Sequence, residues 1–187
     1  MPLPARLDPR RSALLLVDWQ ERLFEAMPAG ARDEARVRAA NLRWLCSELE
    51  LPMFASEQYP RGLGRTLPDL LIPDTVEKLS FSALRVEGLA TRLADALPSG
   101  SEPRNVLLAG METHICVAQT ARDLGLAGYR VWLVADACLS RRRFDWDMGV
   151  QRIHGDGAII VSAEAALFEL LGEAGTPLFK ELSRRIR

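Results

Sequence analysis

The chain has 187 residues, and its 25 acidic and 24 basic side chains leave a formal net charge of −1. This length favours one domain, residues 1–187, and the near-neutral charge gives no reason to expect nucleic acid or an anionic membrane as a partner. There is no apolar run long enough for a membrane span or, in residues 1–11, for a signal peptide, and three irregularly spaced cysteines favour a reducing cytoplasm over a disulfide framework.

The first strong pattern is a continuous apolar run over residues 12–18 (SALLLVD), which predicts a buried strand ending in Asp18. Open α/β folds place ligand-binding groups at the carboxyl ends of such strands, although Asp18 could equally be a solvated strand end or a helix cap. Residues 33–49 are expected to form a helix with Cys46 on its apolar face, so Cys46 belongs to the core. A short strand over residues 52–56 follows, and then a loop rich in Pro and Gly.

The next landmark is the segment TVEKLSFSAL, residues 75–84, in which alternating side chains predict a third strand. Val76, Lys78 and Ser80 would share one face of it. A lysine in such a segment is usually a surface residue, so Lys78 becomes of interest only if it points into a cleft. A helix is expected next, from about Gly88 to Leu97.

Residues 104–128 combine a strand, a sharp turn and a helix. The apolar run from Val106 to Ala109 predicts a buried parallel strand, ended by Gly110. Apolar residues at helical spacing then lead to a C-terminal cap at Gly128. Cys116 falls in the first turn of this helix, where free N–H groups and the positive end of the dipole favour a thiolate. It is the candidate nucleophile, with a buried structural cysteine as the alternative.

The C-terminal part continues the alternation of strands and helices. A buried strand is expected over residues 129–137, with Asp136 at its end and Cys138 packed in the loop beyond, and SRRRFDW is expected to be a charged loop. The remaining expected elements are a helix around residues 145–154, a strand over 158–162, a helix over 164–172 and a closing helix with Thr176 as its cap and Pro177 at its first position.

Strands that alternate with helices predict βαβ units and a parallel sheet. The fold class is therefore α/β: a three-layer α/β/α Rossmann-like sandwich with a mostly parallel six-stranded sheet. Asp18, Lys78 and Cys116 each lie at or near the end of a different strand. Because the carboxyl ends of parallel strands meet at one rim, these three side chains could come together.

The motifs that carry these three residues resemble the isochorismatase-like cysteine hydrolases. The motifs are VDWQ, EKLSFS and GMETHICVAQTARDL, and the catalytic triad of that family is Asp, Lys and Cys in the same order. The similarity extends through SEQYPRGLGRTLPDL, VADACLSR and SAEAALFELL, and matches best the branch of isochorismatase domain-containing proteins. It covers nearly the whole chain.

The resemblance implies a role for each residue of the triad. Asp18 would be the general base, Lys78 the cation beside it, and Cys116 the nucleophile that forms a thioacyl intermediate. It also implies a cis peptide bond between Met111 and Glu112, with the N–H groups of Glu112 and Cys116 as the oxyanion hole. The substrate would be a small molecule.

The departures from the family bear on metal and substrate. Nicotinamidases of this superfamily bind a metal through an Asp-x-His pair, whereas the corresponding stretch here reads Glu57-Gln58-Tyr59-Pro60. We therefore predict no metal and no cofactor. True isochorismatases lack the nucleophilic cysteine, so Cys116 favours hydrolysis of a C–N bond in an amide, carbamoyl or similar group.

Six further residues flank the rim and are candidates for binding the substrate, although core packing is an equal alternative for the first five: Trp19, Gln20, Phe24, Tyr59, Phe81 and His114. His114 invites a Cys/His dyad, but residues two apart on a turn seldom point together. A structural or substrate-lining role is favoured for it.

Two other functions compete with that of a hydrolase: a scaffold protein that keeps the fold without turnover, and a thiol redox protein that uses Cys116. The resemblance further implies a homo-oligomer. The Arg and aromatic residues Arg141, Phe144 and Trp146 are of the types enriched at interface cores, so we expect a second subunit to bury them.

Overall fold

A computed structural model describes residues 6–100 and 103–187, so the first five residues of the N-terminal segment considered above lie outside the described part. Within it, six strands form one sheet in the order β3-β2-β1-β4-β5-β6, and all five pairs of neighbours are parallel. The strands are β1 (Ser12–Val17), β2 (Met53–Gln58), β3 (Val76–Lys78), β4 (Asn105–Met111), β5 (Arg130–Leu139) and β6 (Ile159–Val161).

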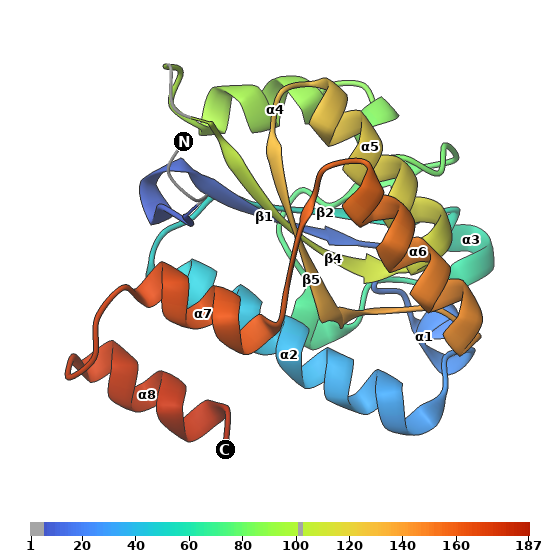
Figure 1. Ribbon diagram of the computed structural model, residues 1–187. Coiled ribbons are helices and arrows are strands. Elements are labelled where there is room, and N and C mark those ends of the chain that lie inside the picture. The colour runs from blue at the N-terminus through green and yellow to red at the C-terminus, as the bar shows by residue number, and fades with distance from the viewer. Residues whose placement is uncertain (1–5, 101–102) are drawn as a thin grey trace.

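Helices cover both faces of the sheet, which confirms the predicted three-layer α/β/α sandwich (Figure 1). One face carries α2 (Ala29–Glu48), α7 (Ala163–Leu171) and α8 (Pro177–Arg185), and the other carries α4 (Leu89–Ala96), α5 (Ala118–Leu126) and α6 (Arg143–Gly155). The short helices α1 (Glu21–Glu25) and α3 (Pro60–Leu63) lie near the carboxyl ends of the strands. Across the described ranges, no helix is long and apolar enough to cross a membrane.

The central strands explain why the apolar runs in the sequence are continuous. Every residue of β1 and of β4 is buried, since helices pack on both faces of a parallel sheet. Cys46 on α2 is completely buried, as predicted, and the hydroxyl group of Thr176 caps α8 by accepting a hydrogen bond from the N–H of Phe179.

Four expected elements differ from the structure. The third strand ends at Lys78 because β2 ends at Gln58 and Tyr59 turns away with a φ of 39°, which leaves the chain after Lys78 without a pairing partner. The fifth strand continues through Cys138, since its register against β4 shifts and pairing resumes at Gly110. The expected charged loop supplies the first residues of α6, and the expected loop after β2 contains α3.

Gly149 on α6 lies against the backbone of the segment that follows β4. A Cβ added at Gly149 would be 2.9 Å from the backbone nitrogen of His114 and 3.0 Å from its Cα, contacts that backbone atoms cannot relieve without shifting. We therefore expect Gly149→Ala to lower the free energy of unfolding by about 1–3 kcal/mol, although alanine favours a helix by about 1 kcal/mol over glycine.

The matched control is Gly155→Ala on the same helix, where an added Cβ meets nothing within 4 Å. Urea unfolding of both variants measures the difference. Equal stability of the two variants would show that α6 and the turn do not constrain each other.

Candidate active site

Asp18 follows β1 directly and is completely buried at the carboxyl edge of the sheet. Its backbone is left-handed, with a φ of 55°, a conformation that aspartate tolerates better than most residues. Its Oδ2 accepts a hydrogen bond from Lys78 Nζ at 2.7 Å, and its Oδ1 accepts one from Ser56 Oγ at 2.7 Å. The carboxylate is thereby fixed at both oxygens.

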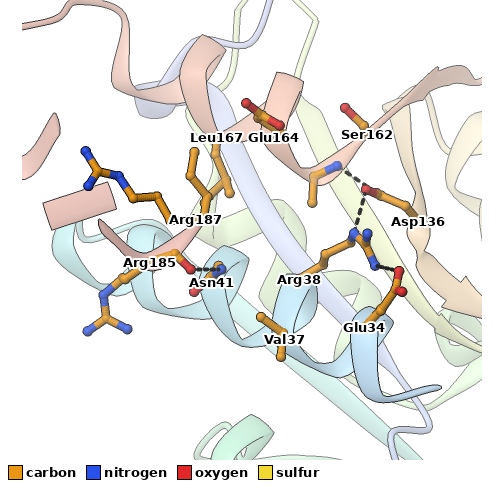
Figure 2. A pocket seen from close by; sticks show the side chains of 12 residues that line it. Glu34, Val37, Arg38, Asn41, Asp136, Ser162, Glu164, Leu167, Arg185 and Arg187 are labelled. Atoms are coloured by element: carbon orange, nitrogen blue, oxygen red, sulfur yellow. Dashed lines mark hydrogen bonds and ion pairs between the residues drawn. The ribbon is translucent and has the colours of Figure 1, made fainter. Parts of the chain in front are cut away.

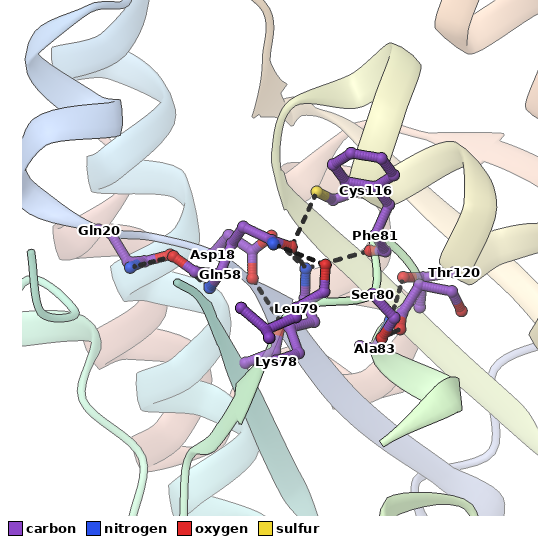
Figure 3. Close-up of polar contacts among 12 residues, drawn as sticks. Asp18, Gln20, Gln58, Lys78, Leu79, Ser80, Phe81, Ala83, Cys116 and Thr120 are labelled. Carbon is purple, nitrogen blue, oxygen red and sulfur yellow. Dashed lines mark hydrogen bonds and ion pairs between the residues drawn. The ribbon is translucent and has the colours of Figure 1, made fainter. Parts of the chain in front are cut away.

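Lys78 is the last residue of β3, and its side chain is as buried as that of Asp18, with 0% exposed for each. Its ammonium donates three hydrogen bonds: to Asp18 Oδ2 at 2.7 Å, to Gln58 Oε1 at 2.8 Å and to the carbonyl oxygen of Phe81 at 3.1 Å (Figure 3). An ammonium group has three donors, so all are in use. The structure thus places Lys78 inside the site and not on the surface.

Cys116 lies in the π-helical turn η4 (Thr113–Val117), which leads into α5. The N–H of Val117 donates to the carbonyl oxygen of Glu112 five residues back, so this first turn is wider than an α-helical one. Cys116 Sγ points toward Asp18 and Gln58 and is 4.0 Å from Gln58 Oε1 (Figure 3). Asp18, Lys78 and Cys116 therefore lie close together, as the strand ends predicted.

The resting form of Cys116 is the thiol. Burial and the nearby Asp18 carboxylate raise the pKa of Cys116, Lys78 lowers it, and the net result is a pKa of about 12. The effect of the helix end, which favours a thiolate, is opposed in the resting protein by desolvation and by the neighbouring negative charge. Deprotonation needs a base at the site.

Asp18 has the properties of such a base. Burial raises the pKa of Asp18, while Lys78, Ser56 and Cys116 act in the opposite direction through charge and hydrogen bonding. A carboxylate with a raised pKa is a stronger base than one in water, and Lys78 keeps its charged form stable. The arrangement can move a proton from the Cys116 thiol to Asp18.

The peptide bond between Met111 and Glu112 is cis, the conformation that the family resemblance implies. The Glu112 carboxylate contacts Arg141, whose N–H and Nε donate to Glu112 Oε2 at 3.2 and 3.0 Å. The carbonyl oxygen of Glu112 accepts from Ile115 and Val117. These contacts fix the backbone between β4 and Cys116.

Three of the substrate-binding candidates have structural contacts. Trp19 and Phe24 are buried and pack together with their ring centroids 6.3 Å apart. Gln20 is also buried, and its Nε2 donates to the backbone oxygens of Gln58 and Gly64. Trp19 and Phe24 therefore pack in the core, and Gln20 holds the backbone at Gln58 and Gly64.

The other three candidates lie on or beside the rim. Tyr59 and Phe81 are each 51% exposed. Tyr59 follows Gln58, which contacts Lys78, and the carbonyl oxygen of Phe81 itself accepts a hydrogen bond from Lys78. His114 is half-buried, and its Nδ1 is 3.0 Å from Ser140 Oγ, so the ring has a partner other than the thiol. Tyr59 and Phe81 are thus the two aromatic candidates whose side chains keep substantial exposed surface.

Sequence reasoning missed two polar residues of this site, Ser56 and Gln58. They alternate along β2, the strand between those that carry Asp18 and Lys78, and both contact the ion pair. Glu57 points to the opposite side, where it accepts from Thr66 and pairs with Arg65. The sequence could have indicated them, because residues two apart on a strand lie on the same face, as Ser56 and Gln58 do on β2.

Two further observations concern other possible sites. Among residues 6–100 and 103–187, no group of three or more His, Cys, Asp or Glu side chains could hold a metal ion. A cavity of about 340 Å³ lies between α2, α7 and α8, away from the triad (Figure 2). Three of its charged side chains pair: Arg38 contacts both Asp136 and Glu34, at 3.1 and 3.0 Å.

Comparison with known proteins agrees with this geometry. The isochorismatase domain model matches residues 12–165. Isochorismatase domain-containing protein 2 from Xenopus laevis is 37% identical over 183 residues, which cover 97% of this chain and 86% of that protein. The structure of the MAR1 ribonuclease from Caenorhabditis elegans aligns with a TM-score of 0.85 and 32% identity, covering 97% of this chain and 92% of that chain.

A more distant structure shares the fold. The YcaC gene product from Escherichia coli, described as an octameric hydrolase of unknown specificity, aligns with a TM-score of 0.87 at 21% identity, covering 99% of this chain and 92% of that chain. The family match and the relatives cover nearly the whole described fold, including β1 and β4 with the turn that bears Cys116. The chain belongs to the isochorismatase-like hydrolases, in the branch of the isochorismatase domain-containing proteins.

Proposed function

We propose that this protein is a metal-independent cysteine hydrolase that cleaves a C–N bond in a small amide, carbamoyl or similar compound. The observation that carries the proposal is the buried ion pair between Lys78 and Asp18, with a 2.7 Å separation, beside the Cys116 thiol. Burying a charge pair costs desolvation free energy, and such pairs cluster at functional sites. This pair lies next to the proposed nucleophile.

The reaction begins when Asp18 takes the proton of Cys116 and Sγ attacks the carbonyl carbon. The N–H groups of Glu112 and Cys116 stabilise the oxyanion, a contribution of about 2.7–4 kcal/mol per donor in known cases. The C–N bond breaks as Asp18 returns the proton to the nitrogen, and a thioester remains on Cys116. Water then attacks the thioester with Asp18 as base, the acid product leaves, and the thiol is restored.

Lys78 acts in this scheme as a fixed charge. With its three donors taken by Asp18, Gln58 and Phe81, it has none for the substrate oxygen. Its role is to stabilise the negative charge that Asp18 and Cys116 share, whichever of them holds the proton. This leaves the oxyanion to backbone donors.

Cysteine labelling tests the identity of the nucleophile. Burial raises the pKa of Cys46 and of Cys138 to about 12, as it does for Cys116. We expect iodoacetamide to label Cys116 fastest because it alone of the three has both a carboxylate base and an ammonium group beside it. Peptide mapping after partial labelling measures the order, and faster labelling of Cys46 or Cys138 would contradict the assignment.

A substrate screen tests the function itself. A panel of small primary amides, ureas and carbamoyl compounds is expected to yield ammonia with at least one member, and Cys116→Ala to yield none. Mass spectrometry of the wild-type protein during turnover should show an acyl mass on the Cys116 peptide. Cleavage of an RNA substrate that survives in Cys116→Ala, with no amide turned over, would instead favour the activity named for the Caenorhabditis elegans relative.

We also infer that the protein is a homo-oligomer, and that α6 contributes to the interface. Phe144 and Met148 lie one turn apart on this helix and are 69% and 40% exposed. Arg141 and Trp146 already have partners in the chain, in Glu112 and the carbonyl oxygen of Cys138. Sedimentation at micromolar concentration should show an oligomer that Phe144→Glu weakens, and a wild-type monomer would contradict this.

A further inference from the structure

The geometry points to Gln58 as a positioning residue that holds the Lys78 ammonium on Asp18 and thereby lets Cys116 react near neutral pH. This inference rests on the proposed function, in which Cys116 is the nucleophile. Gln58 is the last residue of β2, between the strands that carry Asp18 and Lys78. It does not need to touch the substrate for this role.

The carboxamide of Gln58 is fixed in one orientation. Its Oε1 accepts from Lys78 Nζ at 2.8 Å, while its Nε2 donates to the carbonyl oxygen of Leu79 at 3.0 Å. The backbone of Gln58 is held as well: its N–H donates to Gln20 Oε1 at 2.7 Å, and its carbonyl oxygen accepts from Gln20 Nε2 at 3.0 Å. The buried Gln20 thus braces Gln58, which in turn holds Lys78 (Figure 3).

Removal of the Gln58 oxygen would leave one ammonium donor of Lys78 unpaired in a site where the lysine side chain is 0% exposed. An unpaired donor on a buried cation is costly, and the cation is then held less firmly in place. The positive charge beside Asp18 and Cys116 would then weaken or move. The negative charge that this pair must share for reaction would form only at higher pH.

A second effect of Gln58 has the opposite sign and is weaker. Its Oε1 also faces Cys116 Sγ, at 4.0 Å, and an acceptor there favours the protonated thiol. Loss of the oxygen would by this route ease deprotonation. The contact with the ammonium is charge-assisted and short, whereas the contact with sulfur is long and neutral, so the loss of support for Lys78 decides the direction.

The test is the pH dependence of iodoacetamide labelling at Cys116 in the full chain. Gln58→Met keeps the length of the side chain and removes both polar ends. We expect the onset of labelling to move up by about one pH unit, and the rate at pH 7 to fall about tenfold. Gln58→Asn keeps a polar side chain but is too short to reach Lys78, so it should show the same shift even if the methionine variant folds poorly.

The matched control is Glu57→Gln, on the same strand but facing Thr66 and Arg65. It should lower stability without moving the onset of labelling. The quantity to compare is the pH at which labelling of Cys116 begins. If this pH in Gln58→Met and Gln58→Asn is the same as in Glu57→Gln, or lower, the inference is overturned.

A Lys78→Met background separates this inference from the proposed function. If Gln58 acts through Lys78, Gln58→Met adds no further upward shift once Lys78 is gone, and only the weaker downward effect of losing the contact with Cys116 can remain. A shift in Lys78→Met but not in Gln58→Met would refute the role of Gln58 alone. If Lys78→Met itself leaves the labelling profile unchanged, the proposed catalytic arrangement fails.

Discussion

Asp18→Asn is expected to lower kcat/KM on any amide substrate found in the screen by about 10²–10⁴-fold, the usual contribution of a general acid–base residue. Asparagine has nearly the shape of aspartate but cannot accept the proton of Cys116. The loss should be larger than that of any substitution outside the triad. Steady-state kinetics on the purified variant measure it.

The same variant should change the pH dependence of Cys116 labelling. In the wild-type protein, labelling is expected to rise as Asp18 loses its proton, at a pH above the ordinary value of 3.8 because burial raises the pKa of Asp18. In Asp18→Asn the carboxylate that raises the pKa of Cys116 is gone while the Lys78 cation remains, so labelling should no longer follow the titration of Asp18. A labelling profile identical to that of the wild type would exclude Asp18 as the group that controls the reactivity of Cys116.

Asp123→Asn is the matched control for the loss of a carboxylate. Asp123 pairs with Arg85 at 3.0 Å on the surface of α5, outside the proposed site. Surface ion pairs contribute little, about 0–1 kcal/mol, so neither activity nor labelling should change. A comparable loss in this variant would mean that the effect of Asp18→Asn is a general loss of folded protein.

The fold was predictable because its strongest signal is local. Buried parallel strands appear as unbroken apolar runs, as over residues 12–17 and 105–111, and the helices between them follow from periodicity. The ends of the strands were less predictable, because hydrogen bonding to the neighbouring strand determines where each strand stops. The extent of β5 through Cys138 depends on a register shift against β4, which the sequence of β5 alone does not reveal.

The candidate site divides in the same way. Asp18 and Cys116 follow apolar runs, so topology alone could bring them to one rim. Lys78 needed the family resemblance, because a lysine in a short strand is ordinarily solvated. Ser56 and Gln58 carry no chemical signature of their own, and only their distances to Asp18 and Lys78 identify them. The desolvation that opposes a thiolate at Cys116 could not be predicted, because it is a property of the packed site and not of the motif.

Lys78→Met is expected to have the largest effect on stability. It leaves the Asp18 carboxylate buried with no cation, and the removal of one partner from a buried ion pair typically costs about 3–5 kcal/mol. The cost should depend on pH. Without Lys78, the folded-state pKa of Asp18 lies far above its unfolded value near 3.8, so the folded form binds more protons in that window and stability falls as pH rises through it.

Chemical denaturation at pH 5 and pH 8 measures this dependence, with the larger deficit expected at pH 8. The double variant Asp18→Asn/Lys78→Met removes the uncompensated charge and should be more stable at pH 8 than Lys78→Met alone, because the two residues contact each other and their effects are not additive. If Lys78→Met instead shows the same small deficit at both pH values, Asp18 would be stable without its cation. Lys78 would then be needed only for the charge that it places beside Cys116.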